Sequence, residues 1–229
     1  MTWAYPAVMT AAVTTAYLLS RRRQKPLPLN AGQRLGLALG AFCGSMIGAK
    51  LPFVLSDMPG LLSGSAWFDN GKTIVFGLVG GYFGVELAKW ALDIRIKTGD
   101  SFAVPVAVGV ALGRLACFVG GCCYGVHTSL PWGVDFGDGP RHPTQLYETV
   151  FHLSAAAVLA FMEDHDVCRG QRIKLYIMAY LVYRLATEFI RPEPRLWWSL
   201  TGYQWACLAC LPIFALLWLR DRRAMRTQG

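Results

Sequence analysis

The chain has 229 residues, of which 54% are hydrophobic and 16% are charged. Soluble domains carry about 25% charged residues, so the composition excludes an ordinary soluble enzyme and indicates a polytopic α-helical membrane protein. The net charge of +8 does not indicate a nucleic-acid partner, because most lysines and arginines lie beside the ends of apolar runs, at residues 21–34, 89–97, 169–174 and 220–226.

Seven apolar runs are long enough to cross a bilayer. They cover roughly residues 3–20, 35–55, 72–92, 102–119, 144–162, 173–190 and 200–219. With seven spans the four basic groups fall on one side of the membrane, which the positive-inside rule makes cytoplasmic. We therefore expect one all-α integral-membrane domain over residues 1–229, with seven transmembrane helices, the N-terminus outside and the C-terminus in the cytoplasm.

Glycine is frequent in the second and third runs. The second run carries it at every fourth position, and the full set is Gly36, Gly40, Gly44 and Gly48, followed by Gly77, Gly80, Gly81 and Gly84 in the third run. A stripe of small residues lets the backbone of another helix approach closely. The stripe therefore predicts helix packing rather than chemistry.

The fourth run contains an arginine, Arg114, where hydrocarbon is expected. Such a residue marks a functional site by default, and its planar guanidinium suits a phosphate. The preceding Gly113 would give the arginine room. The alternative is a structural salt bridge, although no carboxylate lies three or four residues away on this helix.

A glycine- and cysteine-rich bend, GGCCYG, follows at residues 120–125. Irregular backbone near membrane depth is tolerated where protein or water surrounds it, which indicates a polar pocket. A zinc site is a conceivable alternative, with ligands drawn from Cys117, Cys122, Cys123, His127 and His142. The spacing matches no CxxC pair, so we expect no metal and no cofactor.

The fifth run opens with polar side chains. Within the stretch HPTQLYE at residues 142–148, Gln145 and Glu148 share one helical face with His152. His142 would sit at the mouth of the helix, where an imidazole can accept a proton near neutral pH. A helix cap alone does not explain Gln145, Tyr147 and Glu148 entering the membrane together.

The sixth run places Tyr180, Arg184, Glu188 and Arg191 on one face. Arg184 and Glu188 could simply neutralise each other, so this alternative stays open. Seven cations are not explained by topology and are the raw material for an anion site; they are Lys50, Lys72, Arg114, Arg141, Arg184, Arg191 and Arg195.

Three stretches together resemble the bacterial prolipoprotein diacylglyceryl transferase family. They are GRLACFVGGCCYG, RHPTQLYE and YLVYRLATEFIRPEP, and the resemblance covers about residues 77–204. It implies seven transmembrane helices in the bacterial cytoplasmic (inner) membrane and an active site on the extracytoplasmic side. It also implies transfer of the diacylglyceryl group of phosphatidylglycerol to the cysteine thiol of a prolipoprotein signal peptide, which forms a thioether and releases glycerol phosphate.

The resemblance assigns roles to particular residues. Arg114 and Arg184 match arginines that handle the phospholipid, and these two, with His142 and Glu148, are the expected catalytic residues. The expected substrate-binding residues are Gly113, Gly125, Gln145, Tyr147, Tyr180, Glu188 and Arg191.

The chain departs from the family pattern at three positions. Val75 stands where the family has a third-helix histidine, and Cys117 where it has an asparagine, while Tyr5 is a poor match for the first-helix tyrosine. Because valine cannot accept a proton, His142 or Glu148 becomes the candidate base.

Two other functions remain open from the sequence. One is a related phospholipid-headgroup transferase with a different acceptor. The other is a non-catalytic lipid-binding or redox membrane protein that uses Cys122 and Cys123. The transferase prediction requires Arg114, Arg184 and His142 to line one cavity that opens sideways to lipid.

Overall fold

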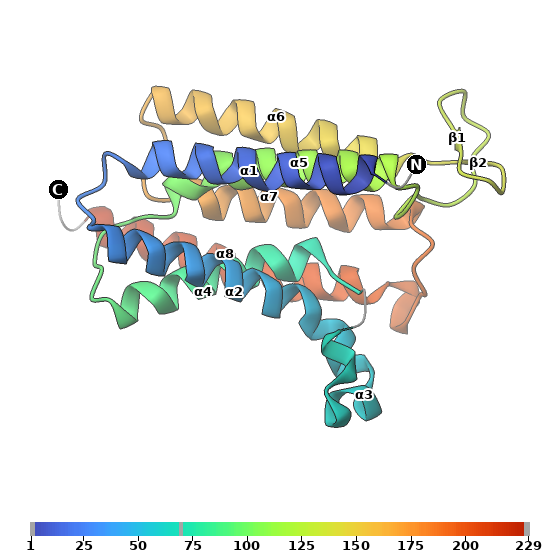
Figure 1. Cartoon of the computed structure of the whole chain (residues 1–229), viewed down its shortest axis with the longest axis horizontal. Helices are drawn as coiled ribbons and strands as arrows, with labels where there is room; N and C mark the ends of the chain where they lie inside the picture. The colour runs from blue at the N-terminus through green and yellow to red at the C-terminus, as the bar shows by residue number, and fades with distance from the viewer. Residues whose placement is uncertain (1–2, 69–70, 227–229) are drawn as a thin grey trace. The chain divides into compact units, whose positions relative to one another are not determined.

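The computed structural model describes residues 3–68 and 71–226, and its regular structure is almost entirely helical (Figure 1). Seven helices of sixteen or more residues lie within this described part, one in each expected run: α1 (Ala4–Gln24), α2 (Ala31–Ser56), α4 (Ile74–Ala91), α5 (Asp100–Val119), α6 (Thr144–Asp164), α7 (Arg172–Thr187) and α8 (Gly202–Arg226). The all-helical prediction is therefore confirmed.

Shorter elements connect these helices. They are α3 (Met58–Ser63), the 3-10 turns η1 (Ser65–Trp67), η2 (Glu188–Ile190) and η3 (Trp197–Ser199), and an antiparallel pair of strands, β1 (Val134–Asp135) and β2 (Pro140–Arg141). The sequence did not predict the strands, which lie in the connection between α5 and α6.

Four of the described helices are long and apolar enough to cross a membrane by length and composition. They are α2, α4, α5 and the Gly202–Ala224 part of α8. Many large apolar side chains are also exposed, as on α6, where Val150, Leu153 and Phe161 face outward. Apolar surface of this extent is unusual in a soluble protein and fits a membrane protein.

The chain divides into two compact units, one formed by Leu27–Lys97 and the other by Met1–Pro26 with Thr98–Gly229. We call them the inserted unit and the main unit, and each is described by itself. The prediction of a single domain over residues 1–229 stays a prediction.

In the inserted unit, α2 and α4 touch along their glycines. A Cβ atom added to Gly44 would lie 2.3 Å from the carbonyl oxygen of Gly80, and one on Gly84 would lie 2.2 Å from that of Gly40. Side chains at these positions would therefore separate the two backbones. The prediction that the stripe serves helix packing is confirmed, and Val75 is buried in this unit.

Local capping fixes where these helices begin. Asn30 and Gln33 form a reciprocal capping box at the start of α2, and the side chain of Thr73 accepts a hydrogen bond from the Phe76 N–H at the start of α4. In the main unit, Thr201 and Gln204 form the same reciprocal pair at the start of α8.

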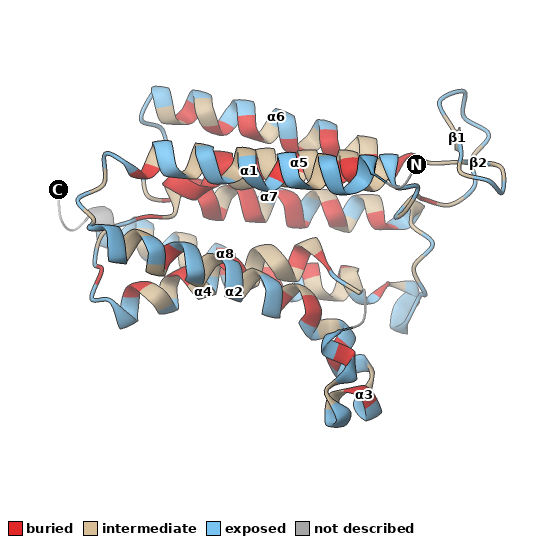
Figure 2. Cartoon of the chain, viewed as in Figure 1, coloured by how far each residue is buried: buried red, intermediate tan, exposed pale blue. Residues whose placement is uncertain are grey.

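In the main unit, α5 contacts α1, α6 and α7, and α7 contacts α8. Small residues allow α5 this central position, because Ala107, Ala111 and Ala116 have no exposed surface and a Cβ on Gly109 would lie 2.9 Å from the Cβ of Ala16. Figure 2 shows buried segments alternating with exposed ones along α6 and α7. Each of these helices therefore buries one face and exposes the other.

Two cations that the topology argument counted as flanking charges are buried in pairs. Arg172 Nη1 lies 3.2 Å from Asp100 Oδ2, and Lys174 Nζ lies 2.7 Å from Asp221 Oδ2. Both cations are at least nine-tenths buried. They join the start of α7 to α5 and α8, so they have a structural role besides any topological one.

Candidate functional site

Three helices of the main unit bring charged side chains to one buried point. Arg114 on α5 places Nε 2.8 Å from Glu148 Oε2 on α6, and Arg184 on α7 donates a hydrogen bond from Nη1 to Glu148 Oε1 at 3.0 Å. All three residues are at most 5% exposed. Arg114 therefore has a salt-bridge partner. Because this partner lies on α6, the residue spacing along α5 could not predict it.

A second carboxylate extends this group. Arg184 Nη2 lies 2.7 Å from Glu188 Oε2, and the Thr201 hydroxyl donates to Glu188 Oε1 at 3.0 Å. The guanidinium of Arg184 also lies over the Tyr203 ring, 4.8 Å from its centre. Arg184 and Glu188 do neutralise each other in part, as the alternative supposed, but within a larger network that includes Glu148.

Arg191 joins the network to the cysteine-rich bend. Its Nη1 donates to the carbonyl oxygen of Cys123 and to the hydroxyl oxygen of Thr144, each at 2.8 Å. Thr144 Oγ1 and Arg114 Nη2 donate to the same carbonyl at 2.9 and 3.5 Å. The carbonyl of Cys123 therefore fixes two of the arginines relative to the bend. We call Arg114, Arg184 and Arg191 the arginine cluster.

Two donors of the arginine cluster are available for a ligand. The Nε atoms of Arg184 and Arg191 are buried, and within the described residues they have no hydrogen-bond partner. A buried charged donor without a partner is costly, and a planar guanidinium binds phosphate oxygens well. The arrangement can therefore accept an anion such as a phosphate.

The predicted substrate-binding glycines differ in what surrounds them. A Cβ on Gly125 would lie 2.5 Å from the Ile190 carbonyl oxygen and 2.8 Å from the His142 Cβ, so only glycine fits there. A Cβ on Gly113 would meet no atom within 4 Å. The space beside Gly113 is open, and the expectation that this glycine makes room for Arg114 stays a prediction.

Gln145 supports the bend directly. It is fully buried, and its Nε2 donates to the Cys122 carbonyl oxygen at 2.6 Å. The prediction placed it on a polar face with Glu148, and both are buried there.

His142 and Tyr147 lie at the start of α6. The hydroxyl of Tyr147 is 3.2 Å from His142 Nδ1 and accepts a hydrogen bond from Trp132 Nε1 at 2.9 Å. Among the described residues, neither side chain is hydrogen-bonded to the arginine cluster. They therefore flank the network rather than belong to it.

Tyr180 is buried on α7 against His152. Their ring centres are 4.9 Å apart, and His152 Nδ1 lies 2.9 Å from the Tyr176 hydroxyl. Tyr180 contributes an apolar and aromatic wall one turn before Arg184.

The hairpin before α6 carries its own ion pair. Arg141 donates from Nε to Asp138 Oδ1 at 2.8 Å and lies over the Tyr124 ring, 4.9 Å from its centre. This hydrogen bond holds the pKa of the Asp138 carboxyl below its ordinary value. The backbone N–H groups of Gly137 and Gly139 likewise lower the pKa of Asp135. Figure 1 shows the hairpin projecting beyond the start of α6.

Tyr5 on α1 contacts the cysteine-rich bend, which the sequence did not predict. A Cβ on Gly120 would lie 2.8 Å from Tyr5 Cδ2, so the ring rests against the bend. No periodic pattern could have shown this contact, because the two residues lie at opposite ends of separate helices.

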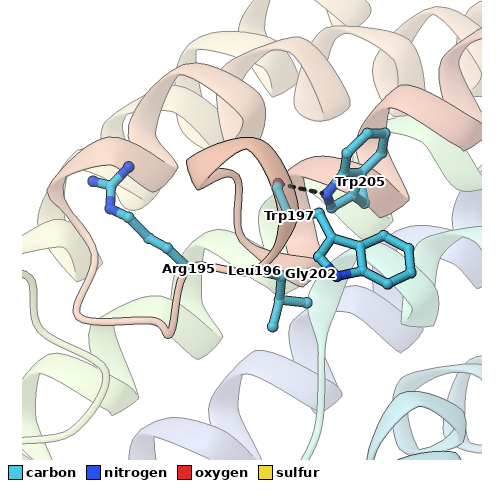
Figure 3. A pocket seen from close by; sticks show the side chains of 5 residues that line it. All are labelled: Arg195, Leu196, Trp197, Gly202 and Trp205. Atoms are coloured by element: carbon cyan, nitrogen blue, oxygen red, sulfur yellow. Dashed lines mark hydrogen bonds between the residues drawn. The ribbon is translucent and has the colours of Figure 1, made fainter.

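A pocket of about 880 Å³ opens near the start of α8 (Figure 3). Its lining is Arg195, Leu196, Trp197, Gly202 and Trp205, and Trp205 Nε1 donates to the Trp197 carbonyl oxygen at 3.3 Å. This lining is mostly apolar and does not include Arg114, Arg184 or His142. The cavity expected around those three residues stays a prediction.

Comparison with known proteins gives consistent results. The family model described as prolipoprotein diacylglyceryl transferase matches residues 2–220. A phosphatidylglycerol–prolipoprotein diacylglyceryl transferase of Clostridium tetani is 30% identical over 84% of this chain and 82% of its own length. A protein of the same name from Nitratidesulfovibrio vulgaris strain DP4 is 33% identical over 81% of this chain and 72% of its own length. Another, from Methylococcus capsulatus, is 29% identical over 97% of this chain and 92% of its own length.

Proposed function

Because the chain belongs to the prolipoprotein diacylglyceryl transferase family, we propose that it transfers the diacylglyceryl group of phosphatidylglycerol to the cysteine thiol of a prolipoprotein signal peptide. The observation that carries the proposal is the convergence of Arg114 and Arg184 on a single buried carboxylate, Glu148. Two guanidinium groups from separate helices are thereby held close enough to act on one phosphate.

In this reaction the thiol sulfur attacks the diacylglyceryl carbon that carries the phosphate oxygen. The new bond is carbon–sulfur, and the bond that breaks is carbon–oxygen, with its electron pair leaving on glycerol phosphate. The thiol proton goes to a base. Negative charge grows on the departing phosphate, and preorganised positive charge is often the largest contribution to catalysis. The arginine cluster supplies that charge.

The phosphate would replace the Glu148 carboxylate as a partner of Arg114 and Arg184, because both arginines are already paired with it. Arg184 and Arg191 each keep a buried Nε–H group available, and these donors supply the first contacts for an incoming anion. Glu148 keeps Arg114 and Arg184 in position until then. Its two oxygens are already engaged by these arginines, which makes Glu148 a positioning residue and a poor proton acceptor.

His142 is the better candidate for the base. Its ring is half-buried beside Tyr147 at the start of α6, and imidazole accepts protons near neutral pH. A free thiol has a pKa near 8.5, so forming its thiolate at pH 7 costs about 2 kcal/mol. A base that takes the thiol proton offsets this cost.

The proposal includes an orientation. All seven long helices cross the inner membrane within one transferase domain over residues 1–229, the N-terminus lies outside, and the arginine cluster faces the extracytoplasmic side. The alternation of basic groups along the chain supports it. Membrane lipid is the proposed partner of the apolar pocket at Trp197 and Trp205.

The test is a transfer assay with phosphatidylglycerol vesicles and a signal peptide that contains its acceptor cysteine, read by mass spectrometry of the thioether product. His142→Ala should lower the rate, because it removes the proposed proton acceptor. Glu148→Gln should lower the rate at every pH, because it disorders the arginines.

Full activity in both variants would exclude both residues as the base. A lipid product on an acceptor other than the peptide thiol would favour a related headgroup transferase. Glycerol phosphate release without any lipidated acceptor would contradict the proposed transfer.

A further inference from the structure

Three thiols lie together beside the arginine cluster. Cys117 is in the last turn of α5, and Cys122 and Cys123 are in the bend; their three sulfur atoms all lie within 4.8 Å of one another. Cys122 and Cys123 have their sulfurs 3.6 Å apart, and the Cys122 thiol donates to the Cys117 carbonyl oxygen at 3.6 Å.

The backbone explains how such a compact group forms. Gly121 and Cys123 have φ angles of +65° and +63°, in the left-handed region, which glycine adopts easily and cysteine rarely does. This turns the chain back over the end of α5. The sequence argument against a metal relied on CxxC spacing, which does not account for this turn.

We propose that Cys117, Cys122 and Cys123 bind one soft monovalent cation, Cu(I), through three thiolates. Soft thiolate ligands suit Cu(I), zinc and iron–sulfur clusters, and of these Cu(I) is the ion whose coordination three sulfurs can complete, in a trigonal site. A structural zinc site requires four ligands, and within the described residues the group of close ligand atoms contains these three cysteines and neither His127 nor His142.

The charges around the group suit this ligand. Binding one Cu(I) releases three thiol protons and leaves a net charge of −2 on the metal and its three sulfurs. Arg114 and Arg191 both bond to the carbonyl of Cys123, so two guanidinium groups are near enough to offset it. The copper remains Cu(I), and no electron transfer is involved.

The bound ion would also hold the bend that supports the candidate active site. Gln145 donates to the carbonyl of Cys122, while Thr144 and Arg191 donate to that of Cys123. Fixing the three sulfurs would therefore fix the acceptors that orient these side chains. The proposed ion has a positioning role, and its binding does not depend on the diacylglyceryl transfer.

The direct test is a Cu(I) titration of the purified, detergent-solubilised full chain, reduced with a phosphine and competed against a chromogenic Cu(I) chelator. We expect one Cu(I) per chain. Each of Cys117→Ser, Cys122→Ser and Cys123→Ser should weaken binding at least about tenfold, the lower end of the loss seen when even a supporting residue of a metal site is changed.

Cys43→Ser is the matched control, because Cys43 is exposed on α2 in the inserted unit. It should leave affinity and stoichiometry unchanged. If the cluster variants do not fold, X-ray absorption of the copper-loaded unmodified chain decides instead, with sulfur-only coordination at about 2.3 Å expected, close to other metal–thiolate bonds.

Three results would overturn the proposal. The first is equal Cu(I) affinity in the cluster variants and the control. The second is copper coordinated by nitrogen or oxygen in place of sulfur. The third is a disulfide among the three cysteines, detected by mass spectrometry in protein taken directly from the membrane. The last result would assign the cluster to thiol oxidation instead. The peptide-lipidation assay, run with and without Cu(I), separates failure of the metal site from failure of the transferase proposal.

Discussion

The two units hold their helices together by opposite means. In the inserted unit, α2 and α4 meet backbone to backbone along glycines, with no side chain between them at Gly44 and Gly80. In the main unit, α5, α6 and α7 meet through the buried charges of Arg114, Glu148 and Arg184. The glycine contacts consist of backbone atoms, which supply no side chain for catalysis. Buried ion pairs cost desolvation and are weak evidence for stability, so the convergence of two arginines on Glu148 makes this point the candidate for chemistry, whereas the buried pairs of Arg172 and Lys174 join helices.

The largest expected effect is on activity in the main unit. Arg114→Ala and Arg184→Ala should each lower the transfer rate about 10²–10³-fold, the loss typical of removing one preorganised donor from a transition-state site. Steady-state transfer into a cysteine peptide measures this effect. Arg169→Ala is the control, because it removes the same charge from an exposed position.

Loss of activity in these variants should exceed any loss of folded protein. Equal losses in the rate and in the soluble, monodisperse fraction would mean that the cluster is structural. The contrast between the two units would then fail.

The next effect is on stability in the inserted unit. Gly44→Ala should lower the free energy of unfolding by about 1–3 kcal/mol, the usual cost of overpacking, because the added Cβ would lie 2.3 Å from a backbone oxygen. Gly77→Ala is the matched control on α4, since its Cβ would lie 3.5 Å from the nearest atom, the Ala49 Cβ. Detergent-induced unfolding followed by circular dichroism measures both.

Gly125→Ala sharpens the comparison, because it places a glycine contact inside the main unit. Its Cβ would press on the Ile190 carbonyl oxygen and the His142 Cβ, so the bend should shift and activity should fall about tenfold, which corresponds to about 1.4 kcal/mol. Gly113→Ala should have a smaller effect, because the space there is open. Greater loss in Gly113→Ala would reverse this ranking and indicate that a ligand fills that space.

The smallest effect concerns the hairpin. Its carboxyls Asp135 and Asp138 have lowered pKa values in the fold, so their stabilising contribution is complete above the ordinary pKa of 3.8 and is lost as pH falls through the lower folded values. Both are exposed, so the loss should stay local. Amide hydrogen exchange of the Gly137 and Gly139 N–H groups should rise below about pH 4 relative to that expected from intrinsic rates. Asp135→Asn should show that faster exchange already at neutral pH.

Much of the fold follows from sequence, because apolar runs and basic flanks report directly on helices in a membrane. The run boundaries lie close to the observed helices, and the glycine stripe predicted the contact between α2 and another helix. The β1–β2 hairpin was missed, since strands of two residues have too little alternation to detect.

The candidate site was predictable in its members but not in its connections. Arg184 and Glu188 could be paired because they lie four residues apart in the sixth apolar run. The pairing of Arg114 with Glu148 joins α5 to α6, and the contact of Tyr5 with the bend joins α1 to α5; neither has a spacing rule. The cysteine group depends on the left-handed backbone conformation of Gly121 and Cys123. Cysteine rarely adopts this conformation, so no sequence pattern reveals it.

In the proposed transferase, Glu148 occupies the guanidinium donors that the lipid phosphate would use. The Glu148 carboxylate is already paired with both guanidinium groups, so an anionic lipid would have to compete with it for these arginines. A bilayer contains anionic lipids in great excess. Without the Glu148 carboxylate, the arginine cluster would remain saturated with whichever anionic lipid bound first. Under this proposal, competition from Glu148 would weaken the binding of every anionic headgroup to a similar extent. Discrimination between lipids would then depend on the remaining contacts, and the product phosphate would leave more easily.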